Sequence, residues 1–237
     1  LGDVYKRQAL LDTQQAMGGN SQGGSIAGLP CPLGAHYLPL PGDDAAEVQD
    51  WLEALGLRQR RAGRWQYDER HLCHSPQERL FWQGAWHEGL LPVDGVASRT
   101  LEQYELFARS VAQEMERAAF AMPSIRVWQR EGRLPAAHAA LDGQTMQAWL
   151  VSQGIDDAQL IWYLEYCCRD DFGAGLARVS AWAGIHYFAS RHGFSAPRRQ
   201  DERTAEEAGD AVLTWPQGNG WLSQQLVAGL GSTDLQT

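Results

Sequence analysis

The strongest constraint on the fold is a pair of glycine-rich segments near opposite ends of the chain. The first, residues 17–24, follows the short apolar run 9–12, and the second, residues 216–220, follows the strand-like run 211–215. A glycine-rich turn after a strand lets main-chain N–H groups approach a phosphate, because glycine has no side chain in the way. The region between the two segments is mostly helical in pattern. This order predicts a nucleotide-binding domain with a helical domain inserted in it.

The expected fold class is therefore α/β + α, a partial Rossmann-like FAD-binding type of domain with an inserted, mainly helical substrate domain. The first domain would consist of residues 9–44 and 211–237, and the inserted domain of residues 45–210. Apolar periodicity and cap residues predict the individual elements. These are a helix capped by Asp43 and Asp44 that ends at Leu55, a strand at 64–67, a helix opened by a capping box of Thr100 with Gln103, helices at 145–153, 157–168 and 176–190, a surface loop at 195–210, a strand at 211–215 and a helix at 221–230.

Composition excludes several classes of function. Of the 237 residues, 44% are hydrophobic and 21% are charged, which is ordinary for a globular protein and argues against disorder. The formal net charge is −9, the pI is about 5.2, and no Lys/Arg run is long enough to follow phosphates. Nucleic acid is therefore not an expected partner. No apolar stretch reaches the roughly 20 residues of a transmembrane segment. The ten Trp residues predict large aromatic surfaces in a core, a cofactor pocket or an interface.

The first eight residues, LGDVYKRQ, differ from the rest. Lys6 is the only lysine, and the other 19 of the 20 basic residues are arginines, which is typical of a GC-rich genome. We interpret residues 1–8 as a non-native, adapter-like segment of a metagenomic reading frame; a genuine N-terminus with one chance lysine is the alternative. On this interpretation the chain is a fragment truncated at both ends. The cytoplasm is the default location, although an export signal could have been lost with the native N-terminus.

Asp12 ends the first apolar run, six residues before Gly18 and Gly19. In dinucleotide-binding folds a carboxylate at the end of the second strand accepts hydrogen bonds from a ribose. An aspartate followed by a glycine-rich turn is also common in plain surface loops. Taken alone, this pattern leaves both interpretations open.

Three segments taken together resemble flavin-dependent oxidoreductases of the amine oxidase and phytoene desaturase type. They are Asp12 with Gly18-Gly19, then Leu33-Gly34-Ala35-His36-Tyr37, and finally LTWPQGNGWL from Leu213 to Leu222. The resemblance is greatest to a bacterial subgroup described as FAD-dependent or NAD(P)-binding oxidoreductases, and it spans most of residues 9–230.

The chain also departs from that family. The family's GxGxxG is expected about 20 residues before Asp12, where the adapter-like segment stands, and the family's C-terminal segment is not in the sequence. The family's GGR is Gly18-Gly19-Asn20 here. Amine oxidases place a lysine near the flavin, whereas residues 9–237 contain none, which puts amine oxidation in doubt.

The resemblance implies FAD as the cofactor and assigns its contacts. Asp12 would bind the adenosine ribose, and the pyrophosphate would lie along Gly18, Gly19, Asn20 and Ser21. The flavin ring would be flanked by Leu33, Gly34, Ala35, His36, Trp215, Pro216, Gly218, Asn219 and Gly220. In the intact enzyme FAD would take a hydride from a C–H or C–N bond of a small-molecule substrate, and O2 or a quinone would accept the electrons. The fragment itself is expected to be inactive.

The sequence leaves the catalytic residues unknown and offers four candidates. His36 and Trp215 each lie in a glycine-rich segment expected near the flavin. His186 and Tyr187 share a predicted helix with Trp182 and could face a substrate pocket, although such an aromatic stripe is more often core.

Other clusters have plainer interpretations. The run HLCH at 71–74, with His87 beyond it, matches no zinc-site spacing, so no metal site is predicted. Adjacent Cys167 and Cys168 would form a strained disulfide, so two reduced thiols are expected. Arg169-Asp170-Asp171 is expected to form structural ion pairs.

Two other functions stay open. One is a non-catalytic, helix-rich and Trp-rich binding or interaction domain, and the other is a protein that binds NAD(P) as its only cofactor. The glycine pair six residues after an acidic strand end favours FAD over NAD(P). Visible flavin absorption in the purified intact protein would separate the flavoprotein from the binding domain.

Overall fold

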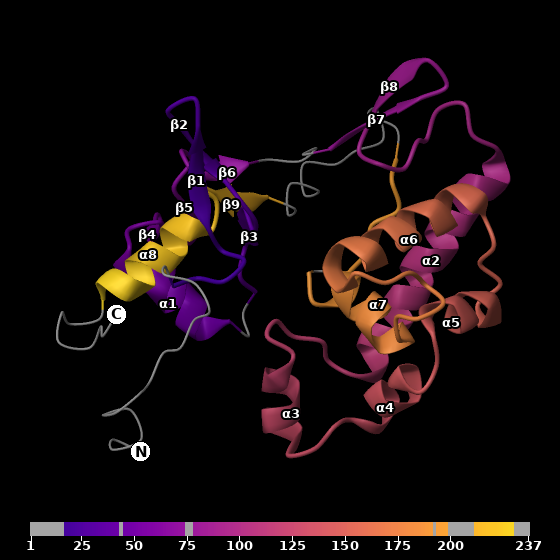
Figure 1. Cartoon of the computed structure of the whole chain (residues 1–237). Helices are drawn as coiled ribbons and strands as arrows, with labels where there is room; N and C mark the ends of the chain where they lie inside the picture. The colour runs from indigo at the N-terminus through magenta and orange to yellow at the C-terminus, as the bar shows by residue number, and fades with distance from the viewer. Residues whose placement is uncertain (1–16, 43–44, 74–77, 192, 199–210, 230–237) are drawn as a thin grey trace. The chain divides into compact units, whose positions relative to one another are not determined.

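The computed structural model describes residues 17–42, 45–73, 78–191, 193–198 and 211–229 (Figure 1). This part of the chain is a mixed α/β structure with eight helices and four small sheets. The chain divides into two compact units. Unit 1 consists of Leu1–Leu40, Gln59–Cys73 and Ala211–Thr237, and unit 2 of Pro41–Arg58 and His74–Asp210. The domain boundaries expected from the sequence, and the assignment of each domain to FAD or substrate, stay predictions.

Unit 1 is built around a three-stranded antiparallel sheet in the order β3-β9-β6. Its strands are β3 (Tyr37–Pro39), β9 (Val212–Thr214) and β6 (Leu72–Cys73). The central strand brings together parts of the chain that are far apart in sequence, because Leu213 pairs with Leu38 on one side and Leu72 on the other. Leu213 is fully buried. Helix α8 (Gly220–Ala228) follows β9, so the predicted order of strand, glycine-rich turn and helix is confirmed.

Three two-stranded hairpins lie in regions where the sequence predicted loops or single strands. They are β1 (Gly23–Ile26) with β2 (Leu29–Pro32), β4 (Arg58–Arg61) with β5 (Arg64–Tyr67), and β7 (Arg79–Trp82) with β8 (Ala85–Glu88). Each hairpin turns through two residues with positive φ, which are Ala27-Gly28, Ala62-Gly63 and Gln83-Gly84. Positive φ at both positions is the type I′ hairpin geometry, for which Asn-Gly and Asp-Gly are the usual signals. Ala and Gln at the first position hid two of the three hairpins. The first glycine-rich segment is therefore not a plain loop.

Unit 2 is mainly helical, as predicted. Its helices are α1 (Ala46–Ala54), α2 (Ser98–Arg117), α3 (Ile125–Glu131), α4 (Ala136–Asp142), α5 (Met146–Ser152), α6 (Ala158–Phe172) and α7 (Ala181–Ala189). The long helix α2 contributes Tyr104, Phe107 and Val111 to a core that also contains residues of α5, α6 and α7. Helices α5 and α7 approach closely because Gly184 leaves room for Met146: a Cβ at Gly184 would lie 2.7 Å from the Met146 sulfur.

The capping box predicted for Thr100 and Gln103 is wrong. Helix α2 begins at Ser98, and its cap residue Ala97 has no side-chain cap hydrogen bond. Both predicted box residues therefore lie inside the helix, and both are buried.

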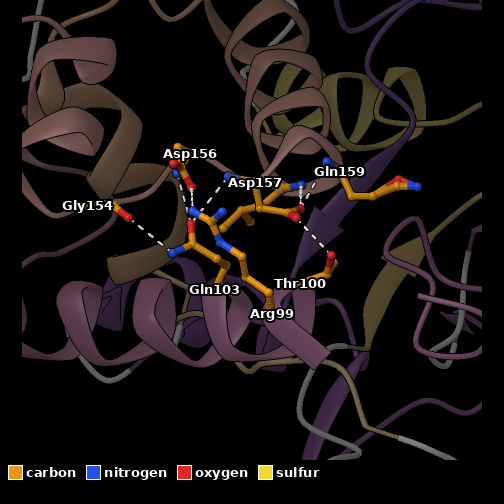
Figure 2. Close-up of polar contacts among 8 residues, drawn as sticks. Arg99, Thr100, Gln103, Gly154, Asp156, Asp157 and Gln159 are labelled. Carbon is orange, nitrogen blue, oxygen red and sulfur yellow. Dashed lines mark hydrogen bonds and ion pairs between the residues drawn. The ribbon is translucent and has the colours of Figure 1, made fainter. Parts of the chain in front are cut away.

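Thr100 and Gln103 instead hold the loop between α5 and α6 (Figure 2). The Thr100 hydroxyl donates to an Asp157 carboxylate oxygen at 2.8 Å. The Gln103 amide nitrogen donates to the Gly154 carbonyl at 3.1 Å, and its amide oxygen accepts from the main-chain nitrogen of Asp156 at 2.9 Å. Because these side chains are used in tertiary contacts, they are not available to cap their own helix.

The helix predicted at 176–190 begins five residues late, at Ala181. Residues before it pair with the start of α5, since Met146 N donates to Val179 O at 2.8 Å and Gln147 N donates to Leu176 O at 3.0 Å. Ser180 then caps α7 by accepting from Ala183 N at 3.2 Å. The apolar spacing that predicted a longer helix is used by a bridging segment.

The caps predicted for the next two helices are confirmed. Thr145 caps α5, and Asp157 caps α6 by accepting from the main-chain nitrogens of Gln159 and Leu160. Helix α6 continues four residues beyond the predicted end, to Phe172. The predicted caps Asp43 and Asp44, most of the loop at 195–210 and Leu230 lie outside the described residues. No described helix combines the length and hydropathy that crossing a membrane would require.

Candidate functional site

Unit 1 brings the three segments singled out in the sequence into direct contact. Within the first segment, Ser21 N donates to Gly18 O at 2.8 Å and closes a turn. The first and second segments are joined because Ala35 N donates to Asn20 O at 2.9 Å. The second and third are joined because Asn219 N donates to Ala35 O at 2.9 Å. Residues 18–21, 33–36 and 215–220 therefore form one structural unit, which we call the glycine junction.

Two glycines make this close packing possible. A Cβ at Gly34 would overlap the main-chain oxygen of Asn20. A Cβ at Gly218 would lie 2.8 Å from the Ala35 oxygen, and Gly218 also has a φ of +58°, in the left-handed region. At both positions the neighbour is backbone, which cannot move aside as a flexible side chain could. The glycines are thus required where one main chain crosses another.

Side chains at the ends of β3 and β9 reinforce the junction. The Asn219 amide nitrogen donates to the Tyr37 carbonyl at 2.8 Å, and the Thr214 hydroxyl donates to the His36 carbonyl at 3.0 Å. The Asn219 amide oxygen is buried and has no hydrogen-bond partner among the described residues. Asn219 therefore holds β3 against the turn that follows β9.

The surface of the junction is formed by the first two segments. Gly19, Asn20, Leu33 and His36 are exposed, with Leu33 exposed over 64% of its surface. A Cβ at Gly19 would meet no atom within 4 Å. This exposed strip is the part of the junction that a ligand could contact. The residues that pack beneath it are Trp215, Gly218 and Gly220, all of which are buried.

Trp215 belongs to an aromatic cluster that the sequence did not predict. Its ring stacks on that of Trp221, with a centroid distance of 5.3 Å and an interplanar angle of 11°. The ring of His71 lies 5.9 Å from Trp215 and 6.2 Å from Trp221. The sequence offered His71 only as part of a zinc spacing that it does not match. No signal in the sequence pointed to its pairing with β9.

The other two catalytic candidates lie in unit 2. His186 Nε2 contacts the Ala121 carbonyl at 3.0 Å, and burial lowers the pKa of this histidine below its ordinary value. The Tyr187 carbonyl accepts from Arg191 at 2.6 Å, and the Arg191 guanidinium also lies 4.6 Å from the Tyr187 ring centroid. Both residues thus have local structural contacts within unit 2. A catalytic role for either remains an untested prediction.

His186 is part of a mostly buried aromatic group with Trp182 and His138. The His186 ring lies 4.9 Å from that of Trp182, which lies 6.0 Å from that of His138. His138 is 1% exposed, and its pKa is lowered first by burial and second by the nearby His186. The arrangement favours neutral histidines packed as core residues.

The two adjacent cysteines are free thiols buried in α6. Burial raises the pKa of Cys167 to about 12 and that of Cys168 to about 11. A thiolate is therefore strongly disfavoured at neutral pH, and neither residue is suited to nucleophilic or redox chemistry. Nearby, Arg169 pairs with Glu165 at 2.8 Å and Arg191 with Asp171 at 3.3 Å, as expected for structural ion pairs.

No group of three or more His, Cys, Asp or Glu side chains suited to a metal ion is found in the described part of the chain. Asp12, the predicted ribose ligand, lies outside that part. Pro216 is exposed at the start of the turn after β9. The glycine junction is thus the candidate site that the described structure supports, and its ribose-binding end stays a prediction.

Comparison with known proteins supports the fold. No protein-family model matches the sequence, and neither does any curated protein. A solved structure of wild-type putrescine oxidase bound to putrescine matches with a TM-score of 0.57 and 16% identity, over 91% of this chain and 42% of that one. A double mutant from a redesign of cofactor binding in putrescine oxidase matches with a TM-score of 0.56 and 15% identity, over 90% and 41%. The present chain shares their fold and spans less than half of their length.

Proposed function

We propose that this chain is part of an FAD-dependent oxidoreductase of the amine oxidase type. The observation that carries the proposal is the glycine junction. Three segments that resemble flavin-binding motifs, separated by up to two hundred residues, are hydrogen-bonded to one another through Asn20, Ala35 and Asn219. The fold shared with putrescine oxidase supports the same conclusion.

The junction fits a dinucleotide cofactor on three grounds. Its glycines let main chain lie at the surface without side chains, which suits a pyrophosphate. The open space at Gly19 is where such a group could approach. The buried, unpartnered Asn219 oxygen and the Trp215 ring provide a polar atom and an aromatic face in the third segment.

The roles of the residues follow from this fit. Gly18, Gly19, Asn20 and Ser21 would hold the pyrophosphate, and Asp12 the adenosine ribose. The second and third segments would flank the ring system, with Leu33, Gly34, Ala35 and His36 on one side and Trp215, Pro216, Gly218, Asn219 and Gly220 on the other. When bound, FAD supplies the hydride acceptor for a C–H or C–N substrate. The chain's own contribution is to orient the cofactor and to exclude water.

The remaining parts of the reaction are proposals of lower resolution. The substrate would be a small molecule such as an amine, and O2 or a quinone would accept the electrons. Unit 2, with Trp182, His186 and Tyr187, would shape the substrate pocket of the intact enzyme. We propose that the intact gene product carries the activity and that the 237-residue chain by itself is inactive.

The test is to purify the intact gene product and examine it for flavin. We expect a visible flavin absorption band, release of FAD by denaturation, and bleaching of the band when an oxidisable amine is added without oxygen. A colourless protein that also fails to take up added FAD would overturn the proposal. Released NAD(P) in place of FAD would favour the dinucleotide-only alternative.

A non-catalytic binding domain is the second candidate, because unit 2 exposes large aromatic side chains. On the β7–β8 hairpin, Phe81 is 59% exposed and Trp86 is 70% exposed, and their rings lie 5.2 Å apart. Exposed aromatic pairs are common in interaction surfaces. A colourless intact protein with unchanged folding would make this function the leading one.

A further inference from the structure

His71 is tied to Thr214, the residue that precedes Trp215. Thr214 N donates to His71 O at 2.8 Å, and His71 Nδ1 lies 3.3 Å from Thr214 O. A carbonyl oxygen only accepts hydrogen bonds, so the imidazole nitrogen in this contact is the protonated one. The imidazole is thereby held beside the end of β9 by the residue it pairs with.

The ring of Trp215 is oriented by packing alone. Its indole nitrogen is buried and has no hydrogen-bond partner among the described residues, although a buried indole usually has one. Trp215 is 4% exposed, so solvent does not replace the missing partner. The rings that stack or tilt against it are those of Trp221 and His71. The orientation of Trp215 therefore depends on these two neighbours.

The same cluster links the two ends of the third segment. Trp215 stands at its beginning, and Trp221 lies in the first turn of α8, just after Gly220. Asn219 and Gly218, between them, make the main-chain contacts to the first two segments. A fixed Trp215–Trp221 pair thus restricts the whole turn from 215 to 221.

We propose that His71 is a positioning residue: its ring fixes the Trp215–Trp221 pair and, through it, the conformation of residues 215–220. This inference rests on the proposed function, in which residues 215–220 flank the cofactor. His71 acts through Trp215 and Trp221 and is not itself assigned a contact with substrate or cofactor.

The experiment measures ring geometry and cofactor affinity separately in the intact gene product. Two nearly parallel indoles at 5.3 Å produce an exciton couplet in circular dichroism, and Trp221→Phe supplies the spectrum without it. His71→Ala removes the ring and its hydrogen bond, whereas His71→Phe keeps a ring of similar shape. His87→Ala is the matched control, because it removes another histidine–tryptophan contact, 5.7 Å from Trp82, in unit 2. FAD affinity is measured for each variant by titration.

We expect His71→Ala to lose most of the couplet and to raise the Kd for FAD about tenfold. His71→Phe should restore the couplet and most of the affinity, and His87→Ala should change neither. An unchanged couplet in a folded His71→Ala protein would overturn the inference. So would a lost couplet with unchanged FAD affinity. A wild-type protein that binds no FAD but shows a couplet dependent on His71 would overturn the proposed function, while leaving the ring-positioning role supported.

Discussion

The side-chain oxygen of Gln103 accepts a hydrogen bond from the main-chain nitrogen of Asp156 at 2.9 Å, across 53 residues of sequence (Figure 2). The same oxygen lies 3.3 Å from Asp157 N, and the amide nitrogen donates to Gly154 O at 3.1 Å. One buried side chain therefore satisfies both donors and an acceptor of the loop that opens α6. Such a side chain is costly to remove, because its partners are left in a site with little access to water.

Replacing Gln103 with Ala should lower the free energy of unfolding by about 1–3 kcal/mol. Urea denaturation at neutral pH measures this change. Gln147→Ala is the matched control, because Gln147 is exposed on α5, and it should shift stability by no more than about 0.5 kcal/mol. Equal effects of the two substitutions would mean that the Gln103 contacts do not hold the loop.

Replacing Gly218 with Ala should destabilise unit 1 by more than backbone strain alone. The new Cβ would lie 2.8 Å from the Ala35 oxygen, in addition to the cost of a positive φ, about 1–3 kcal/mol. Gly28→Ala separates the two effects, because Gly28 has a φ of +80° but no atom within 4 Å of its Cβ position. Denaturation followed by tryptophan emission should show a larger loss for Gly218→Ala. A loss no greater than that of Gly28→Ala would argue against the close packing of the junction.

Acid should destabilise unit 2 through His138 and His186. Burial lowers the pKa of both histidines in the folded protein, so the unfolded chain binds more protons as the pH falls. Their contribution is fully present above the ordinary value of 6.5 and is lost progressively below it. The charged groups that act on His186 are Arg191, which lowers its pKa, and Asp171, which raises it.

The melting temperature between pH 8 and pH 5 tests this dependence. Wild type should lose stability over this range, and His138→Met, which cannot titrate, should lose less of it. His36→Gln changes an exposed histidine of unit 1 and should leave the wild-type dependence intact. If His138→Met shows the full wild-type loss, the buried histidine is not its source.

Thiol labelling should divide the four cysteines into two classes. Burial raises the pKa of Cys167 to about 12 and that of Cys168 to about 11, so thiolate is scarce at pH 8. Both should react with a disulfide reagent far more slowly than the half-buried Cys31 and Cys73, until the protein is unfolded. Mass spectrometry of the labelled peptides identifies the sites. Rapid native-state labelling at Cys167 would contradict the buried position.

Asp12→Ala should weaken FAD retention in the intact gene product if the ribose assignment is right. Loss of a charged acceptor to a hydroxyl costs about 1.5–3 kcal/mol, which corresponds to roughly 10- to 150-fold in affinity. Flavin content after gel filtration measures the effect, with Asp50→Ala on the exposed face of α1 as control. Unchanged flavin in Asp12→Ala would remove Asp12 from the site.

The helices of unit 2 were largely predictable, because their signals are local. Thr145 and Asp157 cap α5 and α6 as expected, since a cap needs only its own helix's first turn. Thr100 and Gln103 show where that logic fails: the same residue pattern that makes a capping box also makes good partners for a loop fifty residues away. The choice depends on which backbone groups lie within reach in the folded chain.

The sequence by itself determined the mixed α/β character, the helical middle and the three glycine-rich segments, because periodicity, caps and glycine content are properties of neighbouring residues. Only the tertiary structure decided that these segments meet, through Asn20, Ala35 and Asn219, and that His71 packs against Trp215 and Trp221. Those contacts arise from the pairing of β9 with β3 and β6, strands drawn from three distant parts of the chain. Pairing between distant strands leaves no local pattern, since the partner that satisfies each main-chain group is fixed only when the chain is folded.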